Sequence, residues 1–355
     1  MGKYYFKFLY IFFLVLALNI FFFSTTNINA KAFLIDEIEV SEKLENNFNK
    51  DALINKGFEN AFRELLSTLI KSKDFDKVKV INLDEIKSMI ETFSIREERF
   101  IDKTYHLKLG VSFNKKKIFD YLETKKIFPA QINKENFLFI PIIIDQLDDN
   151  LLVFSKNPIY ENWNKKNEKS FQIDYLLPTE DLEDLNLIKK NYLDLENYDF
   201  NEIIKKYFLD HSIIALIFKD NDEIKILSKI YIKDKKVIKS NSFKNINLDN
   251  KENLKILINQ LKIIYEDFWK DHNLINTSIK LPLLIQVDNK DLSLSLKFEE
   301  NLKKIDLISH YHIKRINKDS IFYEIVFNGT PKNFINIMEK QNYDIDTQNK
   351  VWILK

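Results

Sequence analysis

Residues 105–113 read YHLKLGVSF, from Tyr105 to Phe113, and this stretch decides how the first part of the chain folds. Apolar residues stand at every second position and alternate strictly with polar residues or glycine. Successive side chains of a β-strand point to opposite faces, so the pattern predicts a strand with one buried face and one wet face. Such strands are typical of antiparallel sheets, and residues 91–100 are the predicted hairpin partner.

The clearest predicted helix precedes this hairpin and covers residues 52–71. Its apolar residues recur with a period of about 3.6 residues, which indicates one buried face. They are Ile54, Phe58, Ala61, Phe62, Leu65, Leu66, Leu69 and Ile70. A strand over 33–40, a short strand over 78–81, a helix over 84–90 and a helix from residue 118 complete the unit. The order β-α-β-α-β-β-α predicts an N-terminal α/β domain over residues 33–128.

A linker with Pro129 leads into a second predicted domain over residues 136–273. Its first strand, FLFIPIII (137–144), is apolar throughout, which indicates a strand covered on both faces. A helical stretch, strands and a long amphipathic helix follow it. The strands cover 212–218, 224–232 and 237–243, and the helix covers 253–270. Strands mixed with helices predict a central α/β domain.

The third predicted domain covers residues 279–355. Residues 291–305 fit either a strand or a helix, and we choose the helix because Glu299-Glu300-Asn301 continues its polar face. Thr330 is the predicted N-cap of a later helix, with Pro331 at its first position. The resulting order, β-α-β-β-α-β, predicts a ferredoxin-like sandwich. The whole chain is therefore predicted to be of mixed α/β (α+β) class, in two or three small domains.

The N-terminus predicts export. Two lysines precede an apolar run over residues 8–23, and small residues follow at Ala30 and Ala32. This layout is that of a signal peptide over residues 1–30, cleaved after Ala30 or Ala32. The run is shorter than the ~20 residues of a membrane-spanning helix. We therefore expect a periplasmic protein without membrane insertion, and the alternative is that residues 4–23 remain as an N-terminal membrane anchor.

The composition argues against several functions. The chain has 54 Lys and Arg against 53 Asp and Glu, so no basic surface predicts nucleic-acid binding. It has no cysteine, which excludes disulfides and thiolate metal ligands. Its only glycines, at positions 2, 57, 110 and 329, cannot form G-x-S-x-G, a P-loop or G-x-G-x-x-G. We predict no cofactor and no catalytic residue.

The densest group of acids lies at the end of DYLLPTEDLED (174–184). Glu180, Asp181, Glu183 and Asp184 could belong to a metal or catalytic site, or could begin a helix. A helix start is favoured, because Thr179 or Asp181 can cap it and acids in a first turn are stabilised by the helix dipole. Acids adjacent in sequence also point in different directions. We predict a structural role.

Three further groups carry chemistry. His310 and His312 share one face of a predicted strand, but zinc needs three or four ligands. Asp145 with Asp148 could act as an acid–base pair, and a surface loop is the simpler interpretation. Trp163 could belong to a binding surface, but we favour packing on the central sheet. We predict no metal site.

The last predicted strand consists of Val351, Trp352, Ile353 and Leu354. In a β-α-β-β-α-β sandwich with strand order 4-1-3-2, the last strand is an edge. An apolar edge strand offers unpaired backbone groups to another chain. We therefore predict that these four residues form an interaction edge, with cover by the central domain as the alternative.

The leader and four segments together resemble a secreted proteobacterial family, the domain-of-unknown-function family 2066. The segments are NKGFENAFRELLSTLI (55–70), YHLKLGVSF (105–113), FLFIPIII (137–144) and LLPTEDLED (176–184). The last is the most specific, because family members tend to carry leucine-proline-leucine before an acidic helix start; Leu177-Pro178-Thr179 departs from this by one residue. The resemblance covers most of residues 33–275. It implies an exported protein and assigns no activity or catalytic residue.

The sequence thus predicts an exported, non-catalytic module of the cell envelope that works by binding or by assisting assembly. Its expected partner is an unknown envelope protein or a second copy of the chain. The alternative is a periplasmic metal- or carboxylate-dependent hydrolase that uses acidic residues with His310 and His312.

Overall fold

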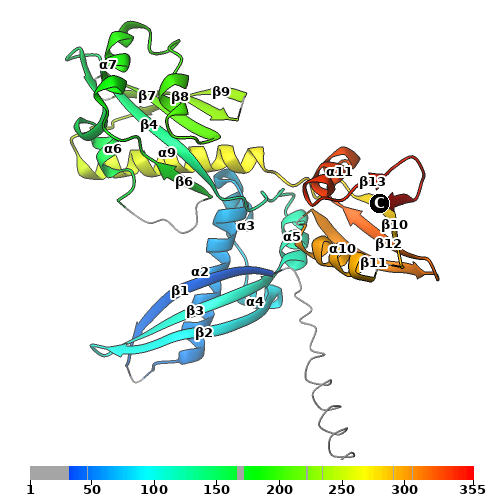
Figure 1. The fold of residues 1–355 in the computed structure, drawn as a ribbon. Coiled ribbons are helices and arrows are strands. Elements are labelled where there is room, and N and C mark those ends of the chain that lie inside the picture. The colour runs from blue at the N-terminus through cyan, green and yellow to red at the C-terminus, as the bar shows by residue number, and fades with distance from the viewer. Residues whose placement is uncertain are drawn as a thin grey trace, which may run out of the picture.

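The computed structural model describes residues 32–45, 47–165, 172–220, 223–233, 235–290, 292–305 and 307–355. Helices and strands each account for 37%, and the strands form three separate sheets, so the mixed α/β class is confirmed (Figure 1). The predicted signal peptide, residues 1–30, lies outside the described residues. Within the described part of the chain, no helix is long and apolar enough to cross a membrane.

The N-terminal sheet has the order β1-β3-β2, with β1 over Ala32–Lys43, β2 over Ile90–Ile101 and β3 over Thr104–Asn114. All pairings are antiparallel. The helix α2 (Lys50–Leu69) packs on one face and covers the apolar residues of β3, of which Leu109 and Val111 are fully buried. The alternation of 105–113 therefore predicted the buried face of this strand correctly.

The predicted strand over 78–81 is wrong. Residues 72–78 form a short turn, η1 (Ser72–Asp74), and one turn of helix, α3 (Phe75–Val78), before α4 (Leu83–Met89). Val78 is buried but Val80 is 89% exposed. One turn of helix places Val78 in the core, with Phe75 and Ile81 packed beside it. A further helix, α5 (Lys115–Thr124), closes the unit.

The central sheet is built on β4 (Glu135–Asp145), which is buried on both faces as predicted. Its order is β5-β4-β7-β8-β9, and β6 pairs with the start of β4. The other strands are β5 (Asn150–Leu152), β6 (Ile173–Leu176), β7 (His211–Asp220), β8 (Glu223–Ile232) and β9 (Lys235–Lys244). The pairings of β4 with β6 and β7 are parallel, and the others are antiparallel.

Helices cover both faces of this sheet (Figure 1). The long α9 (Lys251–His272) and the short α6 (Pro158–Asn162) pack on the face that carries Phe137, Phe139 and Ile143. On the other face lie α7 (Leu182–Lys190) and α8 (Asn201–Lys205), with the short turns η2 (Phe154–Lys156) and η3 (Tyr192–Asp194). Alternate residues of β4 therefore belong to two separate cores.

The C-terminal sheet has the order β11-β12-β10-β14-β13. Its main strands are β10 (Leu281–Asp288), β11 (Ile308–Ile316), β12 (Ser320–Phe327) and β14 (Trp352–Leu354). The ambiguous segment forms the helix α10 (Leu292–Lys304), as we chose. Thr330 caps α11 (Pro331–Lys340) by accepting from the Asn333 N–H at 3.3 Å, as predicted.

The prediction that Val351, Trp352, Ile353 and Leu354 form a sheet edge is wrong. A two-residue strand, β13 (Ile345–Asp346), pairs antiparallel with β14 on its outer side. The Lys355 N–H also donates to the Asp344 carbonyl oxygen at 2.9 Å, and Val351 lies outside the strand. The chain turns back after α11 and so covers the edge with its own backbone, a common protection of apolar edges.

The C-terminal end of α2 is tied to the end of α9. The Lys270 ammonium donates to the carbonyl oxygens of Ser67 and Ile70, the latter at 3.0 Å. Glu266, one turn earlier, accepts from the Ile173 N–H at 2.7 Å. Both side chains are buried, and burial lowers the pKa of Lys270 and raises the pKa of Glu266. We call this contact the α2–α9 junction.

The predicted linker after residue 128 also belongs to the junction. The Ala130 N–H donates to the Leu69 carbonyl oxygen at 2.7 Å, and the Gln172 amide donates to that of Thr68 at 2.7 Å. On its other side, the Ile275 N–H donates to the Pro129 carbonyl oxygen at 2.8 Å. The linker is thus an ordered bridge between the N-terminal and central units.

We expect Lys270→Met to lower the free energy of unfolding by about 2–4 kcal/mol, because two buried carbonyl groups lose their donor. Urea denaturation of the purified chain measures this change. Lys255→Met, an exposed substitution on the same helix, serves as the control and should change the value by less than about 0.5 kcal/mol. Equal effects of the two substitutions would contradict the role assigned to Lys270.

Candidate functional site

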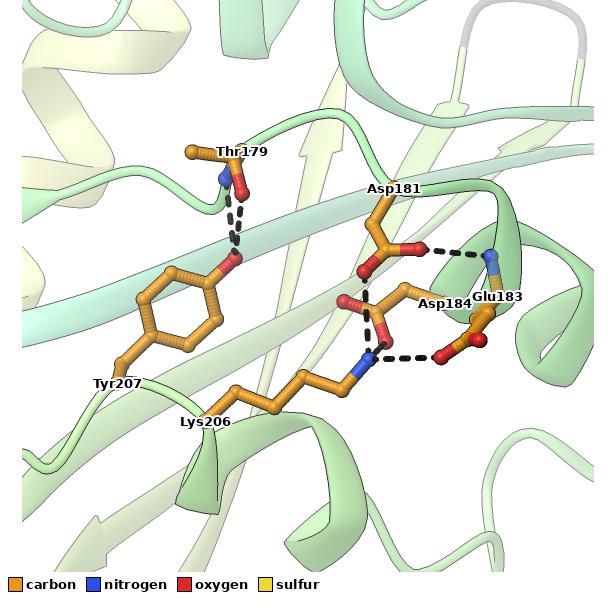
Figure 2. Close-up of polar contacts among 6 residues, drawn as sticks. All are labelled: Thr179, Asp181, Glu183, Asp184, Lys206 and Tyr207. Atoms are coloured by element: carbon orange, nitrogen blue, oxygen red, sulfur yellow. Dashed lines mark hydrogen bonds and ion pairs between the residues drawn. The ribbon is translucent and has the colours of Figure 1, made fainter.

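The acidic stretch begins α7, as predicted. Asp181 is the N-cap, and its carboxylate accepts from the Glu183 N–H at 2.7 Å (Figure 2). This hydrogen bond lowers the pKa of Asp181. Glu180 lies apart from the others and accepts from the Ser155 N–H at 3.1 Å. Capping thus accounts for one of the four acids directly.

The remaining acids surround a lysine that the sequence analysis missed. Lys206, just after α8, places its ammonium 2.7 Å from Asp184, 3.3 Å from Asp181 and 3.8 Å from Glu183 (Figure 2). The hydrogen bond to Asp184 is the main reason that the pKa of Lys206 is raised. Asp184 is only 1% exposed, so its carboxylate requires such a partner. Residue 206 is too far from residues 181–184 in the sequence for any helix or strand periodicity to predict this contact.

The same two segments meet at a second contact, where the Thr179 N–H donates to the Tyr207 hydroxyl at 3.0 Å (Figure 2). The cluster is therefore a polar clamp between the start of α7 and the end of α8. The Lys206 ammonium already occupies the position between these carboxylates. Nowhere in the described residues do three or more His, Asp or Glu side chains form a group able to hold a metal ion.

Asp145 and Asp148 do not form an acid–base pair. Asp145 ends β4, is buried, and pairs with Lys219 at 2.8 Å. Its carboxylate also accepts from the Leu147 and Asp148 N–H groups, at 3.2 and 3.4 Å. The hydrogen bond from Lys219 lowers the pKa of Asp145. The residue thus organises the turn after β4, and the prediction of a surface loop holds for the residues that follow it.

The histidines lie in different units. His310 and His312 are exposed on β11, where His312 lies 3.7 Å from Glu324 and shares that carboxylate with Lys314. His106 lies on β3 of the N-terminal sheet. His211 stacks on Phe137 in the central unit. The fold therefore leaves His310 and His312 on a polar strand face.

Trp163 packs on the central sheet, as favoured. It is fully buried and stacks on Phe139, with 3.8 Å between the ring centroids. Tyr265 of α9 also contacts the indole ring. The residue follows α6 directly, so a tryptophan in a polar sequence segment anchors this short helix to the core.

The structure does expose an apolar surface that the sequence analysis did not identify. On the α2 side of the N-terminal sheet, β2 carries Phe93, Ile95 and Phe100, which are 49%, 38% and 62% exposed. Phe93 packs edge-on against Phe58 of α2. We call these three side chains the β2 row. Only Phe93 and Ile95 alternate with a polar residue in the sequence, and only the sheet order shows that the row borders an edge.

The outer side of β2 is an unpaired edge within the described part of the chain. Its pairing with β3 is irregular between Ile90 and Thr92 and between Ile95 and Glu97. Two regular stretches remain, 92–95 and 97–101. The edge thus presents free backbone groups beside partly exposed apolar side chains.

No protein-family model matches this chain, and no curated protein matches it significantly. The resemblance to family 2066 therefore remains a prediction from sequence.

We expect Lys206→Met to destabilise the protein, because it leaves the buried Asp184 carboxylate without its cation. The double variant Lys206→Met/Asp184→Asn should regain part of the loss, since a neutral amide needs no counter-charge. The midpoint of urea denaturation measures both. Lys205→Met, at the neighbouring exposed lysine, is the control. If Lys206→Met and Lys205→Met unfold at the same urea concentration, the clamp is not structural.

The pairing of Asp145 with Lys219 predicts a pH dependence. The pKa of Asp145 is lower in the folded than in the unfolded chain, whose Asp pKa is ~3.9. The pair therefore stabilises the fold above about pH 4, and this stabilisation is lost as the pH falls further. Asp145→Asn should lower the free energy of unfolding at pH 7 by about 1.5–3 kcal/mol. It should also flatten the profile between about pH 3 and 5. Asp148→Asn is the matched control for urea titrations across this range.

Proposed function

We propose that this chain is an exported, non-catalytic protein of the cell envelope that acts by binding a protein partner. We further propose that the partner docks as an extended segment along the outer edge of β2. The observation that carries the proposal is the β2 row, Phe93, Ile95 and Phe100, beside an unpaired strand edge. Export rests on the sequence of residues 1–30.

Strand addition fits the chemistry of this edge. Backbone N–H and C=O groups of an incoming segment would pair with those of β2, which gives affinity independent of sequence. Alternate side chains of the segment would lie on the α2 side, next to the β2 row and Phe58. Burial of this apolar surface would favour a segment with apolar residues at every second position.

A partner protein suits the edge better than a second copy of β2. The irregularity between Ile95 and Glu97 lies in the middle of the strand. Two antiparallel copies paired around the strand centre would therefore meet at their distorted parts. A shorter segment can pair with residues 92–95 alone, where the register with β3 is continuous.

Two other sheet edges are less suited. The edge strand β9 carries Lys235, Lys236, Lys239 and Lys244, and lysine is a common device against edge pairing. In the C-terminal unit, β13 covers the predicted interaction edge. We also propose that this unit is of the ferredoxin-like type, with β13 as an added strand.

A photo-crosslinking residue at Ser94 tests the proposal in cells that export the protein. We expect one adduct, whose crosslinked peptide mass spectrometry assigns to an extended segment of another envelope protein. Ile95→Lys should lower the yield roughly tenfold, because a buried apolar contact is replaced by a charge. A synthetic peptide of that segment should then slow hydrogen exchange of the β2 amides in the purified chain.

The matched control places the same crosslinker at Ser240 of β9 and the same substitution at Ile238. Neither should affect the adduct at β2. Equal crosslinking at both edges, a peptide that leaves the β2 amides unprotected, or an adduct with a second copy of the chain would each overturn the proposal.

A further inference from the structure

A cleft in the central unit, far in sequence from β2, is a second candidate site. A cleft of about 800 Å³ opens between the segment 152–165, which includes α6, and the first half of α9. Lys219 at the end of β7 completes its wall. Both α6 and α9 belong to the same packed core, as Figure 1 shows by their adjacency on one face of the sheet. The walls are thus held by the core, and the volume is typical of small-molecule sites.

The cleft is more basic than the chain. Six lysines contribute to its lining: Lys156, Lys165, Lys219, Lys251, Lys255 and Lys262. Only three acids do so, Glu161, Asp249 and Glu252. The whole sequence is nearly neutral, with a formal net charge of +1. Lys219 is already paired with Asp145, so five other lysines remain against three acids, which still favours an anionic ligand.

The inner wall carries a polar group without a partner. Trp163 lines the cleft, is fully buried, and its Nε1–H has no hydrogen-bond acceptor among the described residues. An unpaired buried donor costs free energy, so such groups point to an acceptor that a ligand can bring. Lys262, which is 5% exposed, places its ammonium 5.7 Å from the centre of the same indole ring. A cation thus lies over the indole ring whose N–H has no acceptor among the described residues.

The cations that line the described part of the cleft are all lysines. Lysine ammonium groups act as point charges that bind phosphate oxygens from several directions. Apolar lining residues, among them Leu152, Pro158 and Ile258, would contact an uncharged part of the ligand.

We propose that this cleft binds a phosphate-bearing ligand, with the phosphate held by the lysines and an acceptor atom placed at Trp163 Nε1. The ligand is either a soluble phosphorylated molecule or the headgroup of an anionic phospholipid. The site is independent of the β2 edge. If the cleft binds no phosphate, the proposed docking of a partner at β2 is unaffected, and the reverse also holds.

Isothermal titration of the purified mature chain tests the proposal with two probes, pyrophosphate and vesicles of phosphatidylglycerol in phosphatidylcholine. Saturable binding of pyrophosphate indicates a soluble ligand, and binding of the vesicles alone indicates a headgroup. In either case Lys251→Gln/Lys255→Gln should weaken binding roughly tenfold, as two partly exposed charge contacts are lost. These lysines are exposed, so the variant should fold.

Two matched controls accompany that variant. Lys235→Gln/Lys236→Gln removes the same charge from β9 and should leave binding unchanged. Trp163→Phe keeps a ring against Phe139 but removes the N–H, and should weaken binding severalfold. The control for Trp163→Phe is Trp352→Phe in the C-terminal unit, which should leave binding unchanged.

The proposal is overturned if neither probe binds saturably, or if both lysine variants weaken binding equally, which would indicate general attraction to charge. It is also overturned if succinate binds as tightly as pyrophosphate, because the site would then not select phosphate.

Discussion

The last carbonyl groups of a helix have no donor within the helix, so they need one elsewhere when the helix ends inside the protein. The helix α2 ends in this way. The donors come from segments that lie far away in the sequence: Lys270 of α9, the Gln172 amide and the Ala130 N–H. The last carbonyl groups of the main helix thus find donors in the linker and in the central unit. This constraint fixes the place where the two units meet, and the linker at 129–133 follows from it.

The same constraint explains why charged groups lie buried at the junction. Burial disfavours the charged form of Lys270 and of Glu266, yet each has partners that partly offset the cost. The Glu266 carboxylate accepts from the Ile173 N–H, at the start of β6 beside β4. One end of α9 thus holds the junction, while its other end forms a wall of the basic cleft. The helix α9 therefore contributes both to the contact between the units and to the wall of the candidate cleft.

Some polar groups of this chain have a hydrogen-bond or ion-pair partner within the fold, and others have none among the described residues. The buried Asp184 pairs with Lys206, and Asp145 pairs with Lys219, so both buried carboxylates have a cation within the structure. The edge of β2 and the Trp163 Nε1–H have no such partner among the described residues. A high density of acidic residues in the sequence therefore did not indicate a ligand site, because lysines elsewhere in the fold already pair with the buried carboxylates. The groups without a partner, at the β2 edge and at Trp163 Nε1, are the better candidates for binding.

The sequence by itself determined the local elements. Alternation in 105–113 predicted the half-buried β3, the apolar run 137–144 predicted the doubly covered β4, and the pair Thr330–Pro331 predicted the start of α11. These signals are local, because a strand or a helix start depends on residues a few positions apart. The helix start at Asp181 was predictable for the same reason.

Only the tertiary structure decided which edges are free and which charges are paired. Lys206 donates to Asp184, which lies 22 positions earlier in the sequence, and no periodicity predicts such a contact. The two-residue β13 was too short to give any pattern, yet it covers the edge predicted at β14. The β2 row and the lysine cleft exist because strands and helices from distant segments stop where they do. Binding surfaces depend on what is left uncovered after packing, and packing is a property of the whole chain.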